Sequence, residues 1–168
     1  GLSLGGDGSV ATNGFWSALT MATTLKLPML FYIEDNDLGI SVRGDMQTPG
    51  GNIAANLASF TNLKLYDGDG CDPHETAVLL QSAVAHVRSG EGPALVHLTV
   101  PRLSSHSGPD NQKGYRTPEE IAADEARDPL PRLKSYLVPA VLSAAEWAEL
   151  EAEVARDVDV ALTAARAR

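Results

Sequence analysis

Two apolar runs near the start of the chain each end in a short polar sequence, and this pairing constrains the fold more than any other feature. The first run ends at Gly6-Asp7-Gly8, and the second, residues 29–33, ends at Glu34-Asp35-Asn36. A segment of helical character separates them, so the pattern predicts a strand, a helix and a second strand. In open α/β sheets ligands bind outside the carboxyl ends of the strands, which is where we expect Asp7 and Asn36 to lie.

Asp7 and Asn36 carry oxygen atoms that suit a hard divalent cation. Mg²⁺ in proteins usually takes one or two carboxylates and then the oxygens of a phosphate group. Asp7 supplies a charged oxygen and Asn36 a neutral one. Gly6 and Gly8 leave the backbone bare, so a diphosphate can approach the N–H groups that open the following helix. These residues therefore predict a combined site for a metal and a diphosphate.

The segment from Gly5 to Ser41 resembles the thiamine diphosphate motif, which consists of Gly-Asp-Gly, a gap of a little under thirty residues and a terminal Asn. Among thiamine enzymes it is most similar to the decarboxylating first component of 2-oxo acid dehydrogenase complexes, in its alpha-subunit form. The resemblance implies that Mg²⁺ is bound by Asp7, Asn36 and the backbone carbonyl of Leu38, and that Gly6, Gly8 and Ser9 line the diphosphate.

A second Gly-Asp-Gly, residues 68–70, is interpreted as a loop and helix entry. No Asn follows it until Asn111, and Cys71-Asp72-Pro73 is typical of a helix start. A lone triplet of this kind is usually a turn. The second triplet therefore serves as a comparison for the first, whose spacing, intervening helix and flanking strands agree with one another.

A polar segment, residues 101–116, matches the same family in a second place. It contains an Arg, a His-Ser pair, an Asp and a Tyr-Arg pair, namely Arg102, His106-Ser107, Asp110 and Tyr115-Arg116. By resemblance this is a loop over the cofactor, in which His106 is the catalytic residue and Arg102 also contacts the cofactor. Ser107 matches a position that some family members phosphorylate. Taken alone, such a segment is more often a solvated connection.

The composition excludes several classes of protein. The net charge of −9 argues against a nucleic-acid surface, and no apolar stretch approaches the ~20 residues of a membrane span. The single cysteine, Cys71, excludes an intrachain disulfide and is expected to be a small buried or half-buried residue. His97, in an apolar run, is expected to be a hydrogen-bonded strand residue. We expect a bacterial cytoplasmic protein, or one of another reducing intracellular compartment.

Helical and strand patterns alternate along the chain, which predicts an α/β fold with a mostly parallel sheet flanked by helices. By resemblance this is the diphosphate-binding domain of the thiamine diphosphate-binding fold. Capping boxes at Thr117 and Ser143 predict a helical C-terminal extension. We expect residues 1–116 to form the core with its cofactor loop at 101–116, and residues 117–168 to pack on the same domain. The predicted strands lie near 1–5, 29–34, 63–66 and 94–99, and the predicted helices near 13–26, 52–59 and 73–88. An irregular, glycine-rich segment is expected between the second strand and residue 52.

The resemblance implies oxidative decarboxylation of a 2-oxo acid, with thiamine diphosphate and Mg²⁺ as cofactors and acyl transfer to a lipoyl carrier. A branched-chain 2-oxo acid is favoured over pyruvate. The implied partners are a pyrimidine-binding beta domain or subunit and a lipoyl-bearing acyltransferase, in a homo- or hetero-oligomer. The Glu that activates the aminopyrimidine lies in the family's beta part, so the chain is expected to be inactive alone. Family members carry sequence ahead of Gly1, and residues 46–53 are closer to fused alpha–beta versions, so we expect a piece of a larger polypeptide.

Two alternatives remain open at this stage. One is another thiamine enzyme, acetoin-cleaving or transketolase-like, which shares the first motif but does not account for the loop around His106. The other is a catalytically silent assembly domain with the same fold. Retention of Asp7, Asn36 and His106 together counts against a silent domain, because a decayed site need keep none of them.

Overall fold

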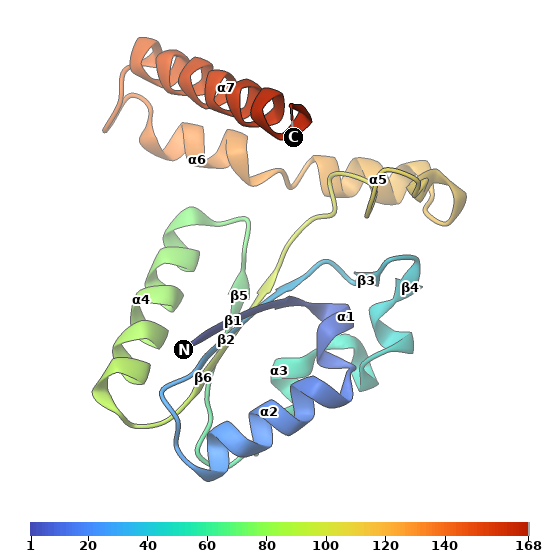
Figure 1. Cartoon of the computed structure of the whole chain (residues 1–168), viewed down its shortest axis with the longest axis vertical. Coiled ribbons are helices and arrows are strands. Elements are labelled where there is room, and N and C mark those ends of the chain that lie inside the picture. The colour runs from blue at the N-terminus through green and yellow to red at the C-terminus, as the bar shows by residue number, and fades with distance from the viewer. Residues whose placement is uncertain (168) are drawn as a thin grey trace. The chain divides into compact units, whose positions relative to one another are not determined.

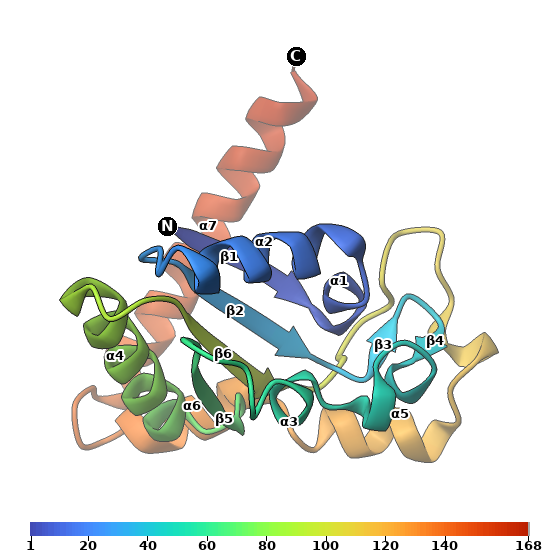
Figure 2. The same ribbon diagram turned by 90° about the horizontal axis from the view of Figure 1, so that it is seen from below.

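The computed structural model describes residues 1–167 as two compact units, Gly1–Pro129 and a helical unit that begins at Leu130. The first unit contains a four-stranded sheet in which every pairing is parallel. Its strands, in the order β1-β2-β6-β5, are β1 (Leu2–Gly6), β2 (Leu30–Asp35), β6 (Ala94–Thr99) and β5 (Lys64–Asp69) (Figure 2). The predicted α/β class with a parallel sheet is confirmed.

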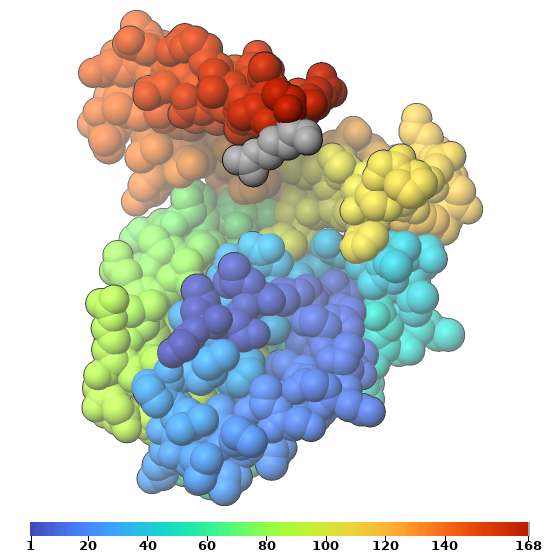
Figure 3. Space-filling view, viewed as in Figure 1, coloured from blue at the N-terminus to red at the C-terminus, as the bar shows by residue number. Residues whose placement is uncertain are grey.

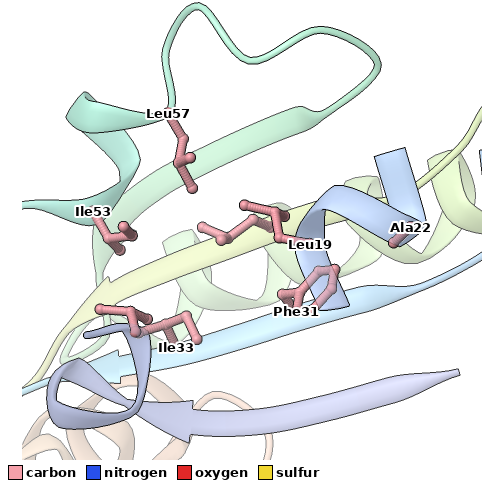
Figure 4. Close-up of a cluster of buried hydrophobic side chains, with 8 residues drawn as sticks. Leu19, Ala22, Phe31, Ile33, Ile53 and Leu57 are labelled. Atoms are coloured by element: carbon pink, nitrogen blue, oxygen red, sulfur yellow. The ribbon is translucent and has the colours of Figure 1, made fainter. Parts of the chain in front are cut away.

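Helices cover both faces of this sheet. Figure 1 shows α4 (Pro73–Ser89) on one side and α2 (Asn13–Thr24) with α3 (Ile53–Asn56) on the other. The central strands β2 and β6 are apolar toward both faces, as expected for a parallel sheet with two covered sides. The core on the α2 side joins four helix and loop segments to the sheet through Val10, Leu19, Ala22, Phe31, Ile33, Ile53, Leu57 and Leu95 (Figure 4). The core on the α4 side consists of Leu30, Ala83, Val87, Ala94, Val96 and Leu98.

The helix boundaries follow local capping signals. The Thr12 side chain accepts a hydrogen bond from the backbone N of Phe15 at 3.3 Å and so caps α2. The Asp72 side chain accepts from the backbone N of His74 at 2.9 Å and caps α4. Gly90 ends α4 in the left-handed conformation at φ 81°, where glycine is favoured. The start of α4 and its end at Gly90 are therefore as predicted.

The second Gly-Asp-Gly triplet departs from its prediction. We expected a strand ending near residue 66 and a loop at 68–70, but β5 continues to Asp69 because residues 67–69 pair with residues 97–99 of β6. The backbone N of Gly70 also donates to the Thr99 carbonyl at 2.9 Å. A Cβ on Gly70 would lie only 2.6 Å from Val100 Cγ1, so this position requires glycine. Pairing with β6 extends the strand to Asp69, and the local composition does not indicate this pairing.

The segment between β2 and α3 was expected to be irregular, and it holds a small hairpin. The strands β3 (Leu38–Gly39) and β4 (Val42–Arg43) pair antiparallel, and 3-10 turns follow at Gly44–Met46 and Pro49–Gly51. Another short element not predicted is α1 (Asp7–Val10), a four-residue helix that directly follows β1. The longer helix α2 begins only at Asn13.

The helix α5 (Pro118–Glu125) belongs to the first unit, which therefore extends beyond the expected boundary at residue 116. The capping box at Thr117 and Glu120 is present as predicted. The second unit contains most of α6 (Pro129–Leu137) and all of α7 (Ala144–Arg166), and a capping box at Ser143 opens α7. The predicted packing of this extension on the first unit stays a prediction. Within residues 1–167, no helix combines the length and apolar character needed to cross a membrane.

The strand β1 lies at one edge of the described sheet and has little cover. Leu2 and Leu4 are 60% and 71% exposed, and β1 is visible at the molecular surface in Figure 3. Its carboxyl end differs, because Gly6 pairs with Glu34 and the next residue, Asp7, is buried. The buried Asp7 therefore follows β1 at the end of the strand where the ligand was expected.

Candidate functional site

A cleft of about 450 Å³ opens at the carboxyl ends of β1 and β2. Its lining combines the first motif with part of the hairpin and with the distant loop around His106. The lining residues are Gly6, Asp7, Gly8, Ser9, Asn36, Leu38, Gly39, Ile40, Gln47 and His106. Seven of the eight residues predicted for the site therefore line one cleft, and Arg102 is the eighth. Their assignment as ligands and catalytic group remains a prediction that this clustering supports.

Asp7 is buried in an unfavourable environment for a carboxylate. Its side-chain oxygen Oδ2 is buried and has no hydrogen-bond partner within residues 1–167. Burial raises the pKa of Asp7, and the negative charges of Asp35 and Asp37 raise it further, against the lowering effect of the backbone N–H groups of Asp7 and Asn36. A buried, unpartnered oxygen is costly unless a ligand satisfies it. Asp7 therefore fits the metal that the sequence predicts.

The turn after β2 places Asn36 and Leu38 beside Asp7. Asn36 accepts a hydrogen bond through Oδ1 from the backbone N of Leu38 at 3.1 Å. The Asp35 carboxylate accepts one from the backbone N of Asp37 at 2.8 Å, and Asp37 has a positive φ of 61°. An amide oxygen has two lone pairs, so Asn36 Oδ1 retains one for a cation. Side-chain clusters of three or more His, Cys, Asp or Glu suited to a metal do not occur within residues 1–167, and this predicted set needs only one such side chain.

Gly8 allows two segments to approach closely across the cleft. A Cβ at Gly8 would lie 3.4 Å from Gln47 Oε1 and 3.4 Å from Gly39 Cα. Ser9 Oγ donates to the Gly6 carbonyl at 2.6 Å, so this side chain folds back on the turn. A side chain at Gly8 would therefore contact both segments and occupy space in the cleft, whereas glycine leaves the backbone open to the predicted diphosphate.

Three lining residues were missed by the sequence analysis, and all come from the segment that was expected to be irregular. They are Gly39, Ile40 and Gln47. Gln47 reaches the cleft because its Nε2 donates to the Val42 carbonyl at 2.8 Å. The hairpin brings Gly39 next to Gln47, so a Cβ on Gly39 would lie 2.3 Å from Gln47 Oε1. Gly39 follows a predicted ligand directly and could have been included, whereas no signal in the sequence marks Gln47.

The loop that carries His106 is held by its own polar groups. The backbone N of His106 donates to Asp110 Oδ2 at 2.8 Å, and Tyr115 Oη donates to the same oxygen at 2.7 Å. The hydrogen bond from Tyr115, with that from His106, lowers the pKa of Asp110. The His106 side chain is exposed and lines the cleft. It is therefore available to a bound group.

Arg102 is placed differently from the other predicted residues. It is buried, it does not line the cleft, and its guanidinium donates through Nη1 to the carbonyl of Ile40. Its backbone N donates to Asp124 Oδ2 at 2.9 Å. In this arrangement Arg102 supports the cleft wall at Ile40, and its contact with the cofactor remains a prediction.

His97 is a hydrogen-bonded strand residue, as predicted, and the structure identifies its partners. It is 1% exposed; Nδ1 lies 2.7 Å from Asp67 Oδ1 and Nε2 lies 2.8 Å from Asp35 Oδ2. Burial acts to lower the pKa of His97, but the hydrogen bonds and charges of Asp35 and Asp67 outweigh it and raise that pKa. Cys71 is also buried as expected.

Comparison with known proteins identifies the family. The family model described as "Dehydrogenase E1 component" matches residues 1–168. The chain belongs to this family. Membership implies thiamine diphosphate as the cofactor, which agrees with the cleft and its glycine-rich wall. The predicted resemblance is thereby confirmed.

The relatives include alpha subunits that are named for a branched-chain 2-oxo acid and others that are named for pyruvate. The chain is 33% identical over 132 residues to the 2-oxoisovalerate dehydrogenase subunit alpha of Bacillus subtilis, which covers 79% of this chain and 40% of the relative. It is 30% identical over 132 residues to the 3-methyl-2-oxobutanoate dehydrogenase subunit alpha of Mycobacterium tuberculosis, with 79% and 36% covered. It is 29% identical over 157 residues to the pyruvate dehydrogenase E1 component subunit alpha of Mycoplasma pneumoniae, with 93% and 44% covered. The chain thus spans less than half the length of these relatives.

Proposed function

We propose that the first unit binds the diphosphate of thiamine diphosphate through Mg²⁺, in the cleft at the ends of β1 and β2. The observation that carries this proposal is the buried, unpartnered Oδ2 of Asp7 in a cleft shared with Asn36 and Leu38. Asp7, the Asn36 amide oxygen and the Leu38 carbonyl would hold the cation. Gly6, Gly8 and Ser9 would line the diphosphate, because no bulky side chain there blocks its approach.

We further propose that the whole protein decarboxylates a 2-oxo acid and passes the acyl group to a lipoyl carrier. When bound, thiamine diphosphate supplies the carbanion chemistry. The chain's own share is to orient the cofactor and to hold a proton donor or acceptor at the cleft. His106 is the residue suited to that role, because it is exposed to the cleft and its loop is ordered by Asp110.

A branched-chain 2-oxo acid is the proposed substrate, with pyruvate next. Support comes from the names of the Bacillus subtilis and Mycobacterium tuberculosis relatives, whereas the Mycoplasma pneumoniae relative is named for pyruvate. These relatives are alpha subunits, so we propose a pyrimidine-binding beta domain or subunit as the partner. A lipoyl-bearing acyltransferase is the proposed acyl acceptor, in a reducing intracellular compartment.

Cofactor binding by Asp7 variants tests the proposal directly. Asp7→Ala removes the charged ligand, and we expect thiamine diphosphate with Mg²⁺ to bind at least about tenfold more weakly, the scale of a charge-assisted contact. Calorimetry on the full-length polypeptide with its partner measures this affinity. Asp69→Ala is the matched control, because Asp69 lies in the second Gly-Asp-Gly and pairs with Arg127 at 3.2 Å outside the cleft. Unchanged affinity in Asp7→Ala, or weaker binding only in Asp69→Ala, would reject the site.

The same assembly separates the proposed activity from its alternatives. A silent assembly domain would leave the assembled wild-type protein without turnover of any 2-oxo acid. An acetoin-cleaving or transketolase-like enzyme would turn over its own substrates and would not acylate a lipoyl carrier from 2-oxoisovalerate. We expect acylation of the lipoyl carrier with 2-oxoisovalerate, and its loss in Asp7→Ala.

A further inference from the structure

We propose that His97 is a positioning residue for the Mg²⁺ site, acting through Asp35 on the turn that carries Asn36 and Leu38. This inference rests on the proposed function of the cleft. His97 does not line the cleft, and within residues 1–167 its hydrogen-bond path toward Asn36 and Leu38 runs through Asp35. Its role would be to hold the turn in the shape that binds the cation, with no contact to cofactor or substrate.

A row of polar side chains crosses three strands at the end of the sheet nearest the cleft. On β6, His97 lies opposite Ile33 of β2 and Asp67 of β5, and Asp35 lies two residues beyond Ile33 on the same face. This face is the one that carries Phe31 and the core on the α2 side. His97 bonds to both carboxylates, at 2.8 Å to Asp35 and 2.7 Å to Asp67. A buried imidazole satisfied on both nitrogens fixes the position of each carboxylate.

Asp35 transmits this restraint to the turn. One carboxylate oxygen, Oδ2, bonds to His97, and the other, Oδ1, accepts the backbone N of Asp37 at 2.8 Å. The Asp35 carbonyl accepts the backbone N of Val100 at 2.8 Å. His97 of β6 therefore holds Asp35 by its side chain, and Val100, the residue after β6, holds it by the backbone. Asn36 and Leu38 lie on either side of Asp37, so a shift of Asp37 moves both predicted ligands.

The turn requires such a restraint because its own conformation is unfavourable. Asp37 has φ 61°, a conformation that non-glycine residues adopt at a cost. It is stabilised from the far side by the backbone N of Gly44, which donates to the Asp37 carbonyl at 3.0 Å. Without His97, Oδ2 of the Asp35 carboxylate, only 10% exposed, would lose its donor, whereas Oδ1 would still accept the N–H of Asp37. A buried oxygen without a donor favours rotation of the carboxylate toward water, which would release the N–H of Asp37.

The structure supplies a matched control on the other side of the same imidazole. Asp67 bonds to Nδ1 of His97 as closely as Asp35 bonds to Nε2, but it lies on β5 and its side chain is 49% exposed. Within residues 1–167 its side chain bonds to His97 and Asn52 and makes no hydrogen bond to the turn from Asp35 to Leu38. If His97 had a purely structural role, loss of either carboxylate would affect the site alike. If His97 is a positioning residue, it acts on metal binding through Asp35 alone.

Metal affinity in the full-length polypeptide with its partner tests this inference without relying on activity. Mn²⁺ binding is followed by electron paramagnetic resonance at a fixed, saturating concentration of thiamine diphosphate. We expect His97→Phe to raise the Kd for Mn²⁺ by about 10-fold to 100-fold, the scale for residues that orient metal ligands. Asp67→Asn should leave this Kd unchanged. Equal weakening in both variants, or none in a folded His97→Phe, would overturn the proposal.

A double-mutant cycle shows whether Asp35 is the link. In the Asp35→Ala background, adding His97→Phe should change the Kd no further, because the path is already broken. If His97→Phe does not fold, the single variant Asp35→Ala decides, and wild-type metal affinity in that variant would overturn the proposal. Weak binding in Asp7→Ala with normal binding in His97→Phe rejects this inference alone. Normal binding in Asp7→Ala rejects the proposed function instead.

Discussion

Arg116 and Asp124 form an ion pair of 2.6 Å that closes the base of the loop carrying His106. The Arg116 side chain is 4% exposed, and the same oxygen of Asp124 accepts the backbone N of Arg102 at 2.9 Å. One carboxylate on α5 thus holds both ends of a loop whose middle reaches the cleft. Removal of a partner from a buried pair costs more than the pair contributes, because it leaves the other charge uncompensated.

Asp124→Ala should therefore loosen the loop. Proteolysis near Lys113 should become several-fold faster, because the loop can then open without breaking hydrogen bonds to Asp124. The rate is measured by limited trypsin digestion and mass spectrometry. Glu125→Ala is the matched control on the same helix, since that side chain is exposed. Equal rates in the two variants would show that Asp124 does not hold the loop.

Much of this fold could be predicted because its signals are local. The helix α4 is bounded by Asp72 and Gly90, whose capping roles depend only on neighbouring residues. The central strands β2 and β6 are apolar runs bounded by polar or glycine-rich segments. The first motif could be predicted equally well, because strand ends and a turn decide where Asp7 and Asn36 lie.

What could not be predicted depends on contacts between distant segments. The last residues of β5 are a strand only because β6 pairs with them. Gln47 lines the cleft through a hydrogen bond within a hairpin that composition did not indicate. The Arg102 guanidinium donates to the Ile40 carbonyl, 62 residues away in the chain, and no sequence signal indicates this bond; the predicted contact of Arg102 with the cofactor stays a prediction. The partners of His97 are likewise brought together by strand order.

Asp7→Asn should stabilise the chain without cofactor while it weakens metal binding. The pKa of Asp7 is raised in the folded state, first by burial, so the folded state binds a proton more tightly than the unfolded state. Its carboxylate therefore destabilises the fold increasingly as the pH rises above its ordinary pKa of 3.8. A neutral amide removes this cost at neutral pH, and the Tm should rise by a few degrees.

Thermal unfolding at neutral pH, with and without thiamine diphosphate and Mg²⁺, measures the effects of Asp7→Asn on stability and on cofactor binding. The cofactor should raise the Tm of the wild-type protein by more than that of Asp7→Asn at the same concentrations. Asp45→Asn, an exposed carboxylate outside the cleft, is the control and should behave as the wild type. A lower Tm for Asp7→Asn without cofactor would contradict the account of Asp7.

His97 should make stability depend on pH in the neutral to alkaline range. Burial opposes its charge, but Asp35 and Asp67 raise the pKa above the ordinary 6.5. The stabilisation from this raised pKa is complete below pH 6.5 and is lost as the pH rises through the folded-state pKa. The Tm should therefore fall over this range, and Asp67→Asn, which removes one carboxylate, should reduce the slope. An identical slope in Asp67→Asn would show that another group titrates.

The 168-residue chain alone should not decarboxylate 2-oxo acids. By resemblance, the Glu that activates the aminopyrimidine belongs to the beta part, so the cofactor would be held at one end and open to water at the other. Product formation from 2-oxoisovalerate or pyruvate is measured with the purified chain. Turnover at the rate of the assembled enzyme would contradict the shared site.

Cofactor binding should protect the loop between residues 104 and 116 from proteolysis. The segment is rich in Ser, Gly, Pro and Asp and has few large apolar side chains, so little burial opposes the entropy of disorder between its anchored ends. His106 lines the cleft, and a bound diphosphate would give its side chain an additional charged partner. Thiamine diphosphate with Mg²⁺ should therefore slow cleavage near Lys113 several-fold in the wild-type protein. His106→Ala should lose most of this protection while keeping the cleavage rate of the free protein. Equal cleavage rates with and without cofactor would show that the loop does not close over it.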